Sequence, residues 1–259
     1  MKHLSPPRFA ARLRHGLVLA LLTVAMASAH AAELTVSAAA SLTNAFKDLG
    51  PIFEAANPGT KVLFNFGASG ALLQQIAKGG APVDVFASAD QETMDQAQSQ
   101  GLVQAAQRRD FVSNTLVVIV PTTTGNLPKA VSDLTDASYR RIAVGLPASV
   151  PVGRYTKGVL ESAGLWTAIE TKMVGANTVR QALDYVARAE VDAGFVYSTD
   201  AALMPDKVKI AFTVPTEQPV LYPIAVVAAS SNAAAERFVA YVASPPAQAV
   251  LARYGFGKP

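Results

Sequence analysis

The sequence AAASLTN at residues 38–44 joins a predicted strand to a predicted helix and decides how the chain can fold. The alternating residues 34–37 before it are typical of a strand, and apolar residues at helical spacing follow it. Residues 38–41 all have small side chains, so the backbone of this turn can approach a ligand closely. Ser41 lies at the predicted start of the helix, where a serine hydroxyl can satisfy a free backbone N–H. Such N–H groups and the helix dipole also favour an anion.

The first 31 residues are predicted to be a cleavable secretory signal peptide. Four basic residues precede or flank an apolar run at residues 16–27, and Ala29-His30-Ala31 matches the small-x-small cleavage pattern. The run is shorter than the about 20 residues of a spanning helix, and an uncleaved anchor is the alternative. Cleavage after Ala31 lowers the net charge from +3 to −1, because four of 22 basic residues leave and all 19 acidic residues stay. A mature chain that is not basic argues against a nucleic-acid partner.

Two residue types are missing from the predicted mature chain. The sequence has no Cys, and its three His all lie within residues 1–31. Disulfides, a thiol nucleophile, a Ser-His-Asp triad and most zinc sites are therefore excluded. Without Cys there is also no residue for a lipid anchor, so we expect a protein free in the periplasm. We also expect it to be a monomer. These absences favour a binding protein without catalytic residues, cofactor or direct metal ligands over an enzyme.

Strand-like and helix-like segments alternate through the chain, which predicts α/β architecture with largely parallel sheets. The apolar stretches at 115–120 and 222–228 are interpreted as crossings between two lobes. Residues 32–114 and 222–259 then form a discontinuous first lobe, and residues 115–221 form the second. A single eight-stranded barrel is the alternative, but the irregular strand spacing fits it less well. Pro51 is expected to kink or restart the first helix.

Serines recur after small residues at the predicted strand-to-helix turns, as Ser41, Ser69 and Ser88. Ligands of open parallel sheets bind outside the carboxyl ends of the strands. The hydroxyl and N–H groups of Ser41 and Ser69 are therefore candidate ligand donors on one edge. Simple helix capping is the alternative for both. Ser88 lies close to Asp90, the predicted cap of the next helix, and is expected to be structural.

The second half of the chain adds three candidate donors. Val152 and Val179 each lie in the first turn of a predicted helix, where the backbone N–H has no partner within the helix. Tyr197 ends a buried strand, so its hydroxyl is expected at the lobe edge, with a core tyrosine as the alternative. Arg180 is a possible charge partner for a ligand, but pairing with Asp184 on a solvated helix face is the favoured interpretation.

Together these positions describe a cleft of hydroxyl and N–H donors without a cation or a carboxylate. Such a cleft suits a fully deprotonated oxyanion such as sulfate, molybdate or tungstate, and a closed cleft strengthens each bond. Phosphate carries a proton near neutral pH and needs an acceptor, which disfavours it. A secreted serine hydrolase using Ser41 or Ser69 is a remote alternative, because it would need Lys or a carboxylate as base.

The chain resembles the periplasmic molybdate-binding proteins of ABC importers, which are type II periplasmic solute-binding proteins. The resemblance extends over nearly all of the mature chain. It is carried, in order, by AAASLTN at 38–44, APVDVFASAD at 81–90, NTLVV at 114–118, AVG at 143–145, VPVGRY at 150–155, VRQAL at 179–183, GFVY at 194–197, YPIAVV at 222–227 and RYGF at 253–256.

This resemblance implies a two-lobed fold that closes on molybdate, and also on tungstate, and delivers it to an inner-membrane permease with its ATPase. The ligand residues it implies are the hydroxyl and N–H of Ser41 and Ser69, the N–H of Val152 and Val179, and the hydroxyl of Tyr197. Two positions depart from the family pattern. Val152 stands where the family often has Ala, which keeps the N–H but narrows the cleft. Leu146 stands where the family often has an acidic residue, which is expected to alter lobe closure or the shell supporting the site.

Overall fold

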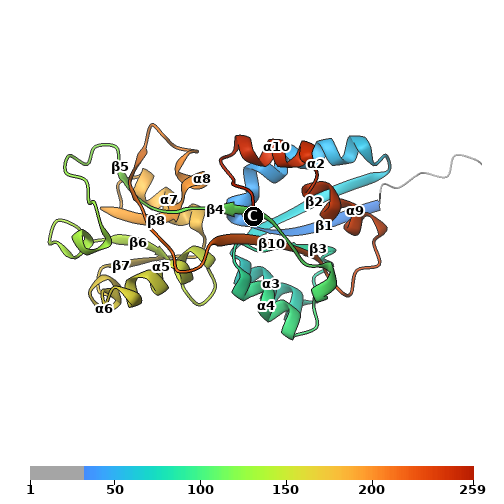
Figure 1. Ribbon diagram of the computed structural model, residues 1–259, viewed down its shortest axis with the longest axis horizontal. Helices are drawn as coiled ribbons and strands as arrows, with labels where there is room; N and C mark the ends of the chain where they lie inside the picture. The colour runs from blue at the N-terminus through green and yellow to red at the C-terminus, as the bar shows by residue number, and fades with distance from the viewer. Residues whose placement is uncertain (1–31) are drawn as a thin grey trace, which may run out of the picture.

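The computed structural model describes residues 32–259, so the predicted signal peptide lies outside the described residues. The chain forms two lobes side by side, each built on a five-stranded sheet (Figure 1). This confirms the predicted two-lobed α/β architecture. Between residues 32 and 259, none of the helices combines the length and the apolar character that a membrane span requires.

The first lobe contains a sheet with the strand order β2-β1-β3-β10-β4. Its strands are β1 (Ala32–Ala39), β2 (Thr60–Gly67), β3 (Val85–Ala87), β4 (Arg109–Asn114) and β10 (Val220–Val226). Its helices are α2 (Thr43–Ala56), α3 (Ser69–Gly79), α4 (Gln91–Ser99), α9 (Ala233–Val242) and α10 (Pro245–Arg253), with 3₁₀ turns η1 (Ala40–Leu42) and η2 (Ala105–Gln107). Helices α2, α9 and α10 cover one face of the sheet, and α3 and α4 cover the other (Figure 1).

The second lobe contains a sheet with the strand order β7-β6-β8-β5-β9. Its strands are β5 (Leu116–Pro121), β6 (Ile142–Gly145), β7 (Met173–Ala176), β8 (Ala193–Tyr197) and β9 (Val208–Thr213). Its helices are α5 (Pro151–Ser162), α6 (Trp166–Glu170), α7 (Val179–Ala187) and α8 (Ser198–Ala201), with the 3₁₀ turn η3 (Val131–Thr135).

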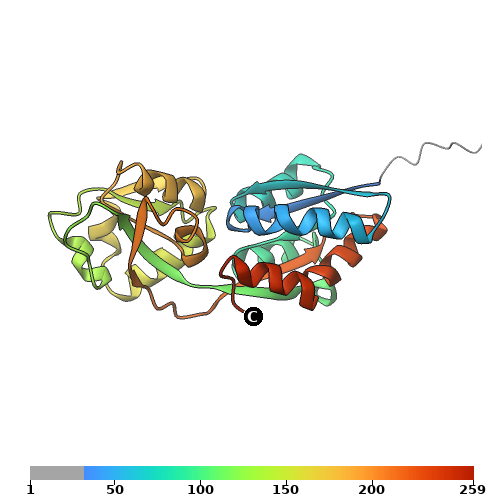
Figure 2. The same ribbon diagram turned by 90° about the horizontal axis from the view of Figure 1, so that it is seen from above.

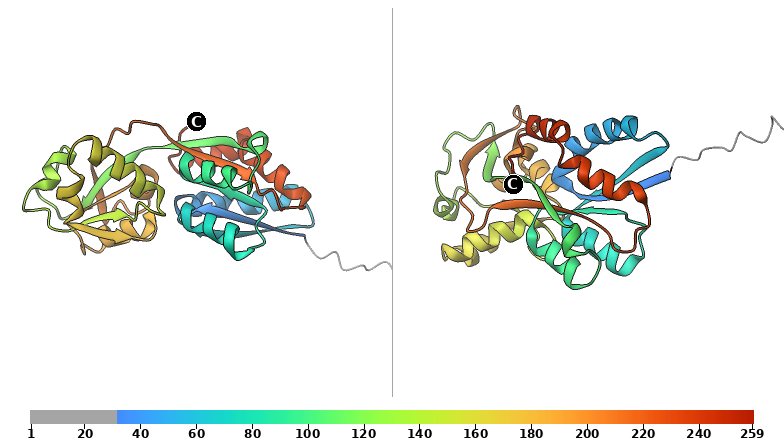
Figure 3. Two further views of the ribbon diagram at one scale, coloured as in Figure 1. Left: turned by 90° about the horizontal axis from the view of Figure 1, so that it is seen from below. Right: turned by 45° about the vertical axis from the view of Figure 1, so that its right-hand side comes forward.

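Both sheets are mixed, but the expectation of largely parallel sheets holds for most strands, since in each sheet one strand runs against the other four. Strand β10 runs antiparallel to β3 and β4, and β5 runs antiparallel to β8 and β9. The chain leaves the first lobe between β4 and β5 and returns between β9 and β10, and the strand that follows each crossing, β5 or β10, runs against the other strands of its sheet (Figures 2 and 3). The apolar stretches read as crossings are therefore strands inside the sheets. Strand β10 begins at Val220, while the lobe boundary was predicted at residue 222.

Aromatic side chains fill the core of the first lobe between α2 and α9. Phe46 and Phe53 of α2 both contact Phe238 of α9, with ring centroids 6.0 and 5.1 Å apart. All three are fully buried, and burial of each side chain contributes about 1.5–3 kcal/mol. The helix does not restart at Pro51, since α2 is one helix from Thr43 to Ala56, and the predicted kink stays a prediction. Pro51 is exposed, so the hydrogen bond that it lacks lies on the solvent side of α2, where water can replace it.

The strand register places the serine turns together. Ala39 at the end of β1 pairs with Gly67 at the end of parallel β2, and Ala38 pairs with Ala87 at the end of β3. The carboxyl ends of these three strands therefore meet at one edge, and the segments that follow them face the second lobe.

Candidate functional site

A small cavity lies between the two lobes, with a volume of about 10 Å³. This is near the volume needed for a single water molecule, so the lobes are closed around very little space. The first lobe contributes small residues from the ends of β1 and β2 and from the turn after β3. All five predicted ligand residues line this one cavity: Ser41, Ser69, Val152, Val179 and Tyr197.

Four helical segments begin at the cavity. Ser41 lies in η1, Ser69 is the first residue of α3, Val152 is the second residue of α5, and Val179 is the first residue of α7. Backbone N–H groups in a first helical turn have no acceptor within the helix. The positive ends of the helix dipoles meet at the same point, so the cavity favours negative charge without a cation lining it.

Neither serine caps a helix with its side chain, so the capping alternative is wrong. The Ser69 hydroxyl oxygen accepts a hydrogen bond from the Ala89 N–H at 3.0 Å. A hydroxyl has one proton, and the proton of Ser69 is left for an acceptor in the cavity. The Ser41 hydroxyl oxygen lies 3.0 Å from the hydroxyl oxygen of Tyr222.

Tyr197 is almost fully buried and reaches the cavity from the end of β8. Its hydroxyl donates a long hydrogen bond, 3.5 Å, to the carbonyl oxygen of Ala89. Burial raises the pKa of Tyr197 well above its usual value, so the hydroxyl keeps its proton. A bond this long is weak, and the hydroxyl can turn to a better acceptor in the cavity.

Two further contacts close the lobes beside the cavity. The Gly70 N–H of α3 donates to the carbonyl oxygen of Ser149 at 3.0 Å. The Arg154 guanidinium of α5 lies 2.6 Å from the carboxylate of Asp90, and both side chains are largely buried. Backbone from one lobe therefore touches backbone from the other at the rim of the cavity.

The prediction that Arg180 pairs with Asp184 on a solvated face is wrong. Its Nε lies 2.6 Å from a carboxylate oxygen of Asp200, which is fully buried. Its other nitrogens donate across the lobes, to the Asn44 side-chain oxygen at 2.8 Å and the Ser41 carbonyl oxygen at 3.1 Å. Burial raises the pKa of Asp200 to about 6, against the opposing effect of Arg180. No sequence spacing indicated this pairing, because Asp200 lies on another element, α8.

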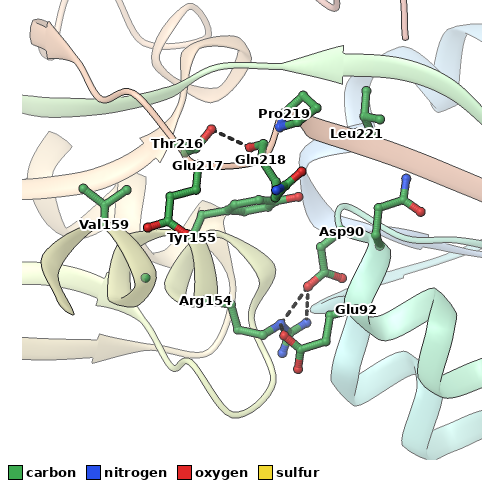
Figure 4. A pocket seen from close by; sticks show the side chains of 12 residues that line it. Asp90, Glu92, Arg154, Tyr155, Val159, Thr216, Glu217, Gln218, Pro219 and Leu221 are labelled. Atoms are coloured by element: carbon green, nitrogen blue, oxygen red, sulfur yellow. Dashed lines mark hydrogen bonds and ion pairs between the residues drawn. The ribbon is translucent and has the colours of Figure 1, made fainter. Parts of the chain in front are cut away.

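A second and larger cleft, of about 490 Å³, lies between the lobes near the chain crossing (Figure 4). Three carboxylates line it, from Asp90, Glu92 and Glu217, together with the guanidinium of Arg154. Figure 4 shows Arg154 directed at Asp90, so its charge is already paired. Carboxylates repel an anion, and the smaller cavity is therefore the better anion site despite its size.

The donor set limits the chemistry that the small cavity can perform. No carboxylate side chain lines it, and residues 32–259 contain no cluster of three or more His, Cys, Asp or Glu suited to a metal ion. The partners of Ser69 and Ser41 are a backbone N–H and a tyrosine hydroxyl. Neither is a general base, so the geometry gives the serine hydrolase alternative no support.

Comparison with known proteins agrees with this arrangement. Residues 34–257 match the model of a family described as bacterial extracellular solute-binding protein. The chain belongs to this family. It is 36% identical over 247 residues to the molybdate-binding protein ModA of Escherichia coli, with 93% of this chain and 95% of that protein covered. It is 35% identical over 235 residues to ModA of Haemophilus influenzae, with 88% and 91% covered.

The fold of this solute-binding protein is also similar to that of a solved structure. The periplasmic molybdate-binding protein of Azotobacter vinelandii superimposes with a TM-score of 0.74 at 26% identity, with 87% of this chain and 99% of that chain covered. Both residues that depart from the family pattern lie in the second lobe. Val152 is fully buried against Gly145, and Leu146 packs over Gly175 within its own lobe. Their effects on the cleft and on lobe closure stay predictions.

Proposed function

We propose that this protein is a periplasmic receptor that captures molybdate between its lobes and delivers it to an ABC importer. One observation carries the proposal: the five predicted ligand residues, from both lobes, line a single cavity without a carboxylate side chain. Ser41, Ser69 and Tyr197 would donate hydroxyl protons, and the first-turn N–H groups would donate from the backbone. The names of the similar proteins support molybdate as the ligand.

Tungstate is proposed as a second ligand, because it has nearly the size and charge of molybdate. Sulfate is a smaller oxyanion, so the same donors would stand further from its oxygens in lobes closed to the same extent. Phosphate near neutral pH brings a proton, and the cavity is lined chiefly by donors. The proposal therefore ranks molybdate and tungstate above sulfate, and sulfate above phosphate.

A thermal melt of ligand-free, refolded protein tests this ranking. Ligand that binds only the native state stabilises it by about 2.7 kcal/mol at a hundredfold excess over Kd. We expect molybdate and tungstate to raise the melting temperature at micromolar concentration, and a large excess of sulfate to leave molybdate bound. An unchanged melting temperature with molybdate and tungstate would refute the proposal.

The serines provide the matched variants. Loss of each hydroxyl is expected to cost about 1.5–3 kcal/mol, the range for hydrogen bonds to a charged group. The Ser41→Ala and Ser69→Ala double variant should therefore lose molybdate binding and stay folded, with a lower ligand-free melting temperature because the Tyr222 hydroxyl and the Ala89 N–H each lose a buried partner. If the double variant binds molybdate with near-wild-type affinity, neither serine is a ligand residue.

Export, the monomeric state and the permease partner are also part of the proposed function. Residues 1–31 would direct export and be removed, leaving a monomer in the periplasm that docks on an inner-membrane permease with its ATPase. Mass spectrometry of a periplasmic extract should give a chain that begins at Ala32, and size-exclusion chromatography should give a monomer. A chain retained with residues 1–31 would contradict the export step.

A further inference from the structure

A buried chain of hydrogen bonds leads from the chain crossing to Ser41. The Tyr222 hydroxyl oxygen lies 3.0 Å from the Ser41 hydroxyl oxygen and 3.1 Å from the side-chain nitrogen of Asn114. Tyr222 is fully buried in β10, and Asn114 is the last residue of β4, where the chain leaves the first lobe. Tyr222 does not line the small cavity, so its effect on a ligand has to pass through Ser41.

The backbone fixes which way the Asn114 amide points. The Thr115 N–H donates to the Asn114 side-chain oxygen at 2.9 Å, and a backbone N–H can only donate. The Ser198 hydroxyl donates to the same oxygen at 3.2 Å. The other end of the amide is therefore the nitrogen, and it donates to Tyr222 and, at 2.8 Å, to Thr199.

The direction of the amide sets the direction of the next bond. Because Tyr222 accepts from Asn114, its own proton needs an acceptor, and within residues 32–259 the only other group bonded to it is the Ser41 hydroxyl. The reverse arrangement, with Ser41 donating, would leave the buried proton of Tyr222 unpaired, which costs free energy. Burial raises the pKa of Tyr222 well above its usual value, so this proton is retained.

We propose that Tyr222 and Asn114 are positioning residues that make Ser41 an obligatory donor to the bound oxyanion. Ser41 accepts from Tyr222, so its own proton points away from Tyr222 and into the cavity. Ser69 is held in the same way by the Ala89 N–H. Each serine has one lone pair occupied by its partner and its single proton free for the ligand, so both serines favour an oxyanion that accepts hydrogen bonds over one that carries a proton. This inference rests on the proposed function and adds the source of its preference for deprotonated anions.

The variant Tyr222→Phe removes the hydroxyl and keeps the ring, which packs on the rings of Tyr197 and Phe256 at 5.8 and 5.6 Å. Calorimetric titration with molybdate should give a Kd about three- to tenfold above wild type, the scale of one neutral hydrogen bond. Tyr241→Phe is the matched control, because it also removes a buried tyrosine hydroxyl of the first lobe, but one without a hydrogen-bond partner among residues 32–259. Its Kd should equal that of wild type.

A double-mutant cycle separates positioning from a general structural effect. In a Ser41→Ala background the Tyr222→Phe change should leave the Kd unchanged within about twofold, because the group that it orients is gone. An equal loss in both backgrounds would overturn the inference. If Tyr222→Phe fails to fold, Asn114→Ala takes its place in the same cycle with the same expected and contrary outcomes.

Wild-type titrations keep the two proposals apart. A wild-type protein that binds neither molybdate nor tungstate would refute the proposed function, and this inference with it. A wild-type protein that binds molybdate, with an equal Kd for Tyr222→Phe, would overturn the inference alone.

Discussion

Gly70 is the point at which the backbones of the two lobes touch, and it provides the sharpest test of lobe closure. Its N–H bonds to the Ser149 carbonyl oxygen at 3.0 Å. A Cβ atom on Gly70 would lie 2.8 Å from that oxygen and 2.9 Å from the Ser149 Cα. Both neighbours are backbone atoms, which have no rotamer to change. In Gly70→Ala the lobes must therefore move apart to accept the methyl group.

The expected loss of affinity follows from what the closed state gives up. The hydrogen bond to Ser149 contributes about 1 kcal/mol. Forcing a methyl group into packed structure costs about 1–3 kcal/mol. Open lobes do not make this contact, so the whole cost, roughly 2–4 kcal/mol, opposes closure and ligand binding. The Kd for molybdate should rise by roughly 30- to 1000-fold.

Two measurements check this expectation. Calorimetric titration gives the Kd, and small-angle X-ray scattering shows whether molybdate still makes the protein more compact. Gly158→Ala is the matched control, since this glycine lies in α5 of the second lobe and a Cβ there would meet nothing within 4 Å. The ligand-free melting temperature of both variants should stay near wild type. If Gly70→Ala binds and compacts like wild type, the contact with Ser149 is not needed for closure.

Three further substitutions test other parts of the molecule. A Cβ in Gly153→Ala would lie 1.9 Å from the Gly145 carbonyl oxygen, so this variant should be strongly destabilised. We expect scanning calorimetry to show a free energy of unfolding lower by about 3 kcal/mol or more and a melting temperature lower by about 6 °C or more. Burial raises the pKa of Asp200 from 3.8 to about 6, so the folded state holds this proton more tightly than the unfolded state. Urea unfolding should show the free energy of unfolding of wild type falling by about 2 kcal/mol relative to that of Asp200→Asn as the pH rises from 4 to 6, and constant relative stability would contradict this. Arg154→Ala leaves the buried Asp90 carboxylate unpaired when the lobes close, and a titration with molybdate should show affinity lower by about tenfold or more.

Local patterns predicted the elements that carry the site. Small residues after an alternating strand marked the turn at Ser41, and the rule that strand ends meet at one edge brought Ser69 beside it. The predicted cap of α4 is also confirmed, since the Asp90 carboxylate accepts from the Thr93 N–H at 3.3 Å. Ser88 is structural as expected, because its hydroxyl donates to the same carboxylate at 3.0 Å. Each of these features depends on residues close together in the sequence or on the geometry that all parallel strands share.

Contacts between distant segments could not be predicted in the same way. Strand β4 was missed, because Arg109 and Asp110 begin it with exposed, charged side chains and it lies at the edge of its sheet. The antiparallel direction of β10 depends on where the chain returns from the second lobe, which no local pattern records. Tyr222 was placed on a strand without a role, since its partner Ser41 lies 181 residues away.

The charged side chains near the site pair with one another outside the lining of the cavity. This arrangement makes the affinity for an anion depend on closure of the lobes. Arg180 pairs with Asp200 behind Ser41, and Arg154 pairs with Asp90 beside the rim, so neither cation faces the cavity unpaired. An unpaired cation in the cavity would attract any anion, even with the lobes open. Hydroxyl and N–H dipoles are weak in water and become strong only where water is excluded. A receptor built this way holds its ligand tightly when closed and weakly when open. Opening of the lobes, for example on docking to a permease, would therefore be enough to release the anion.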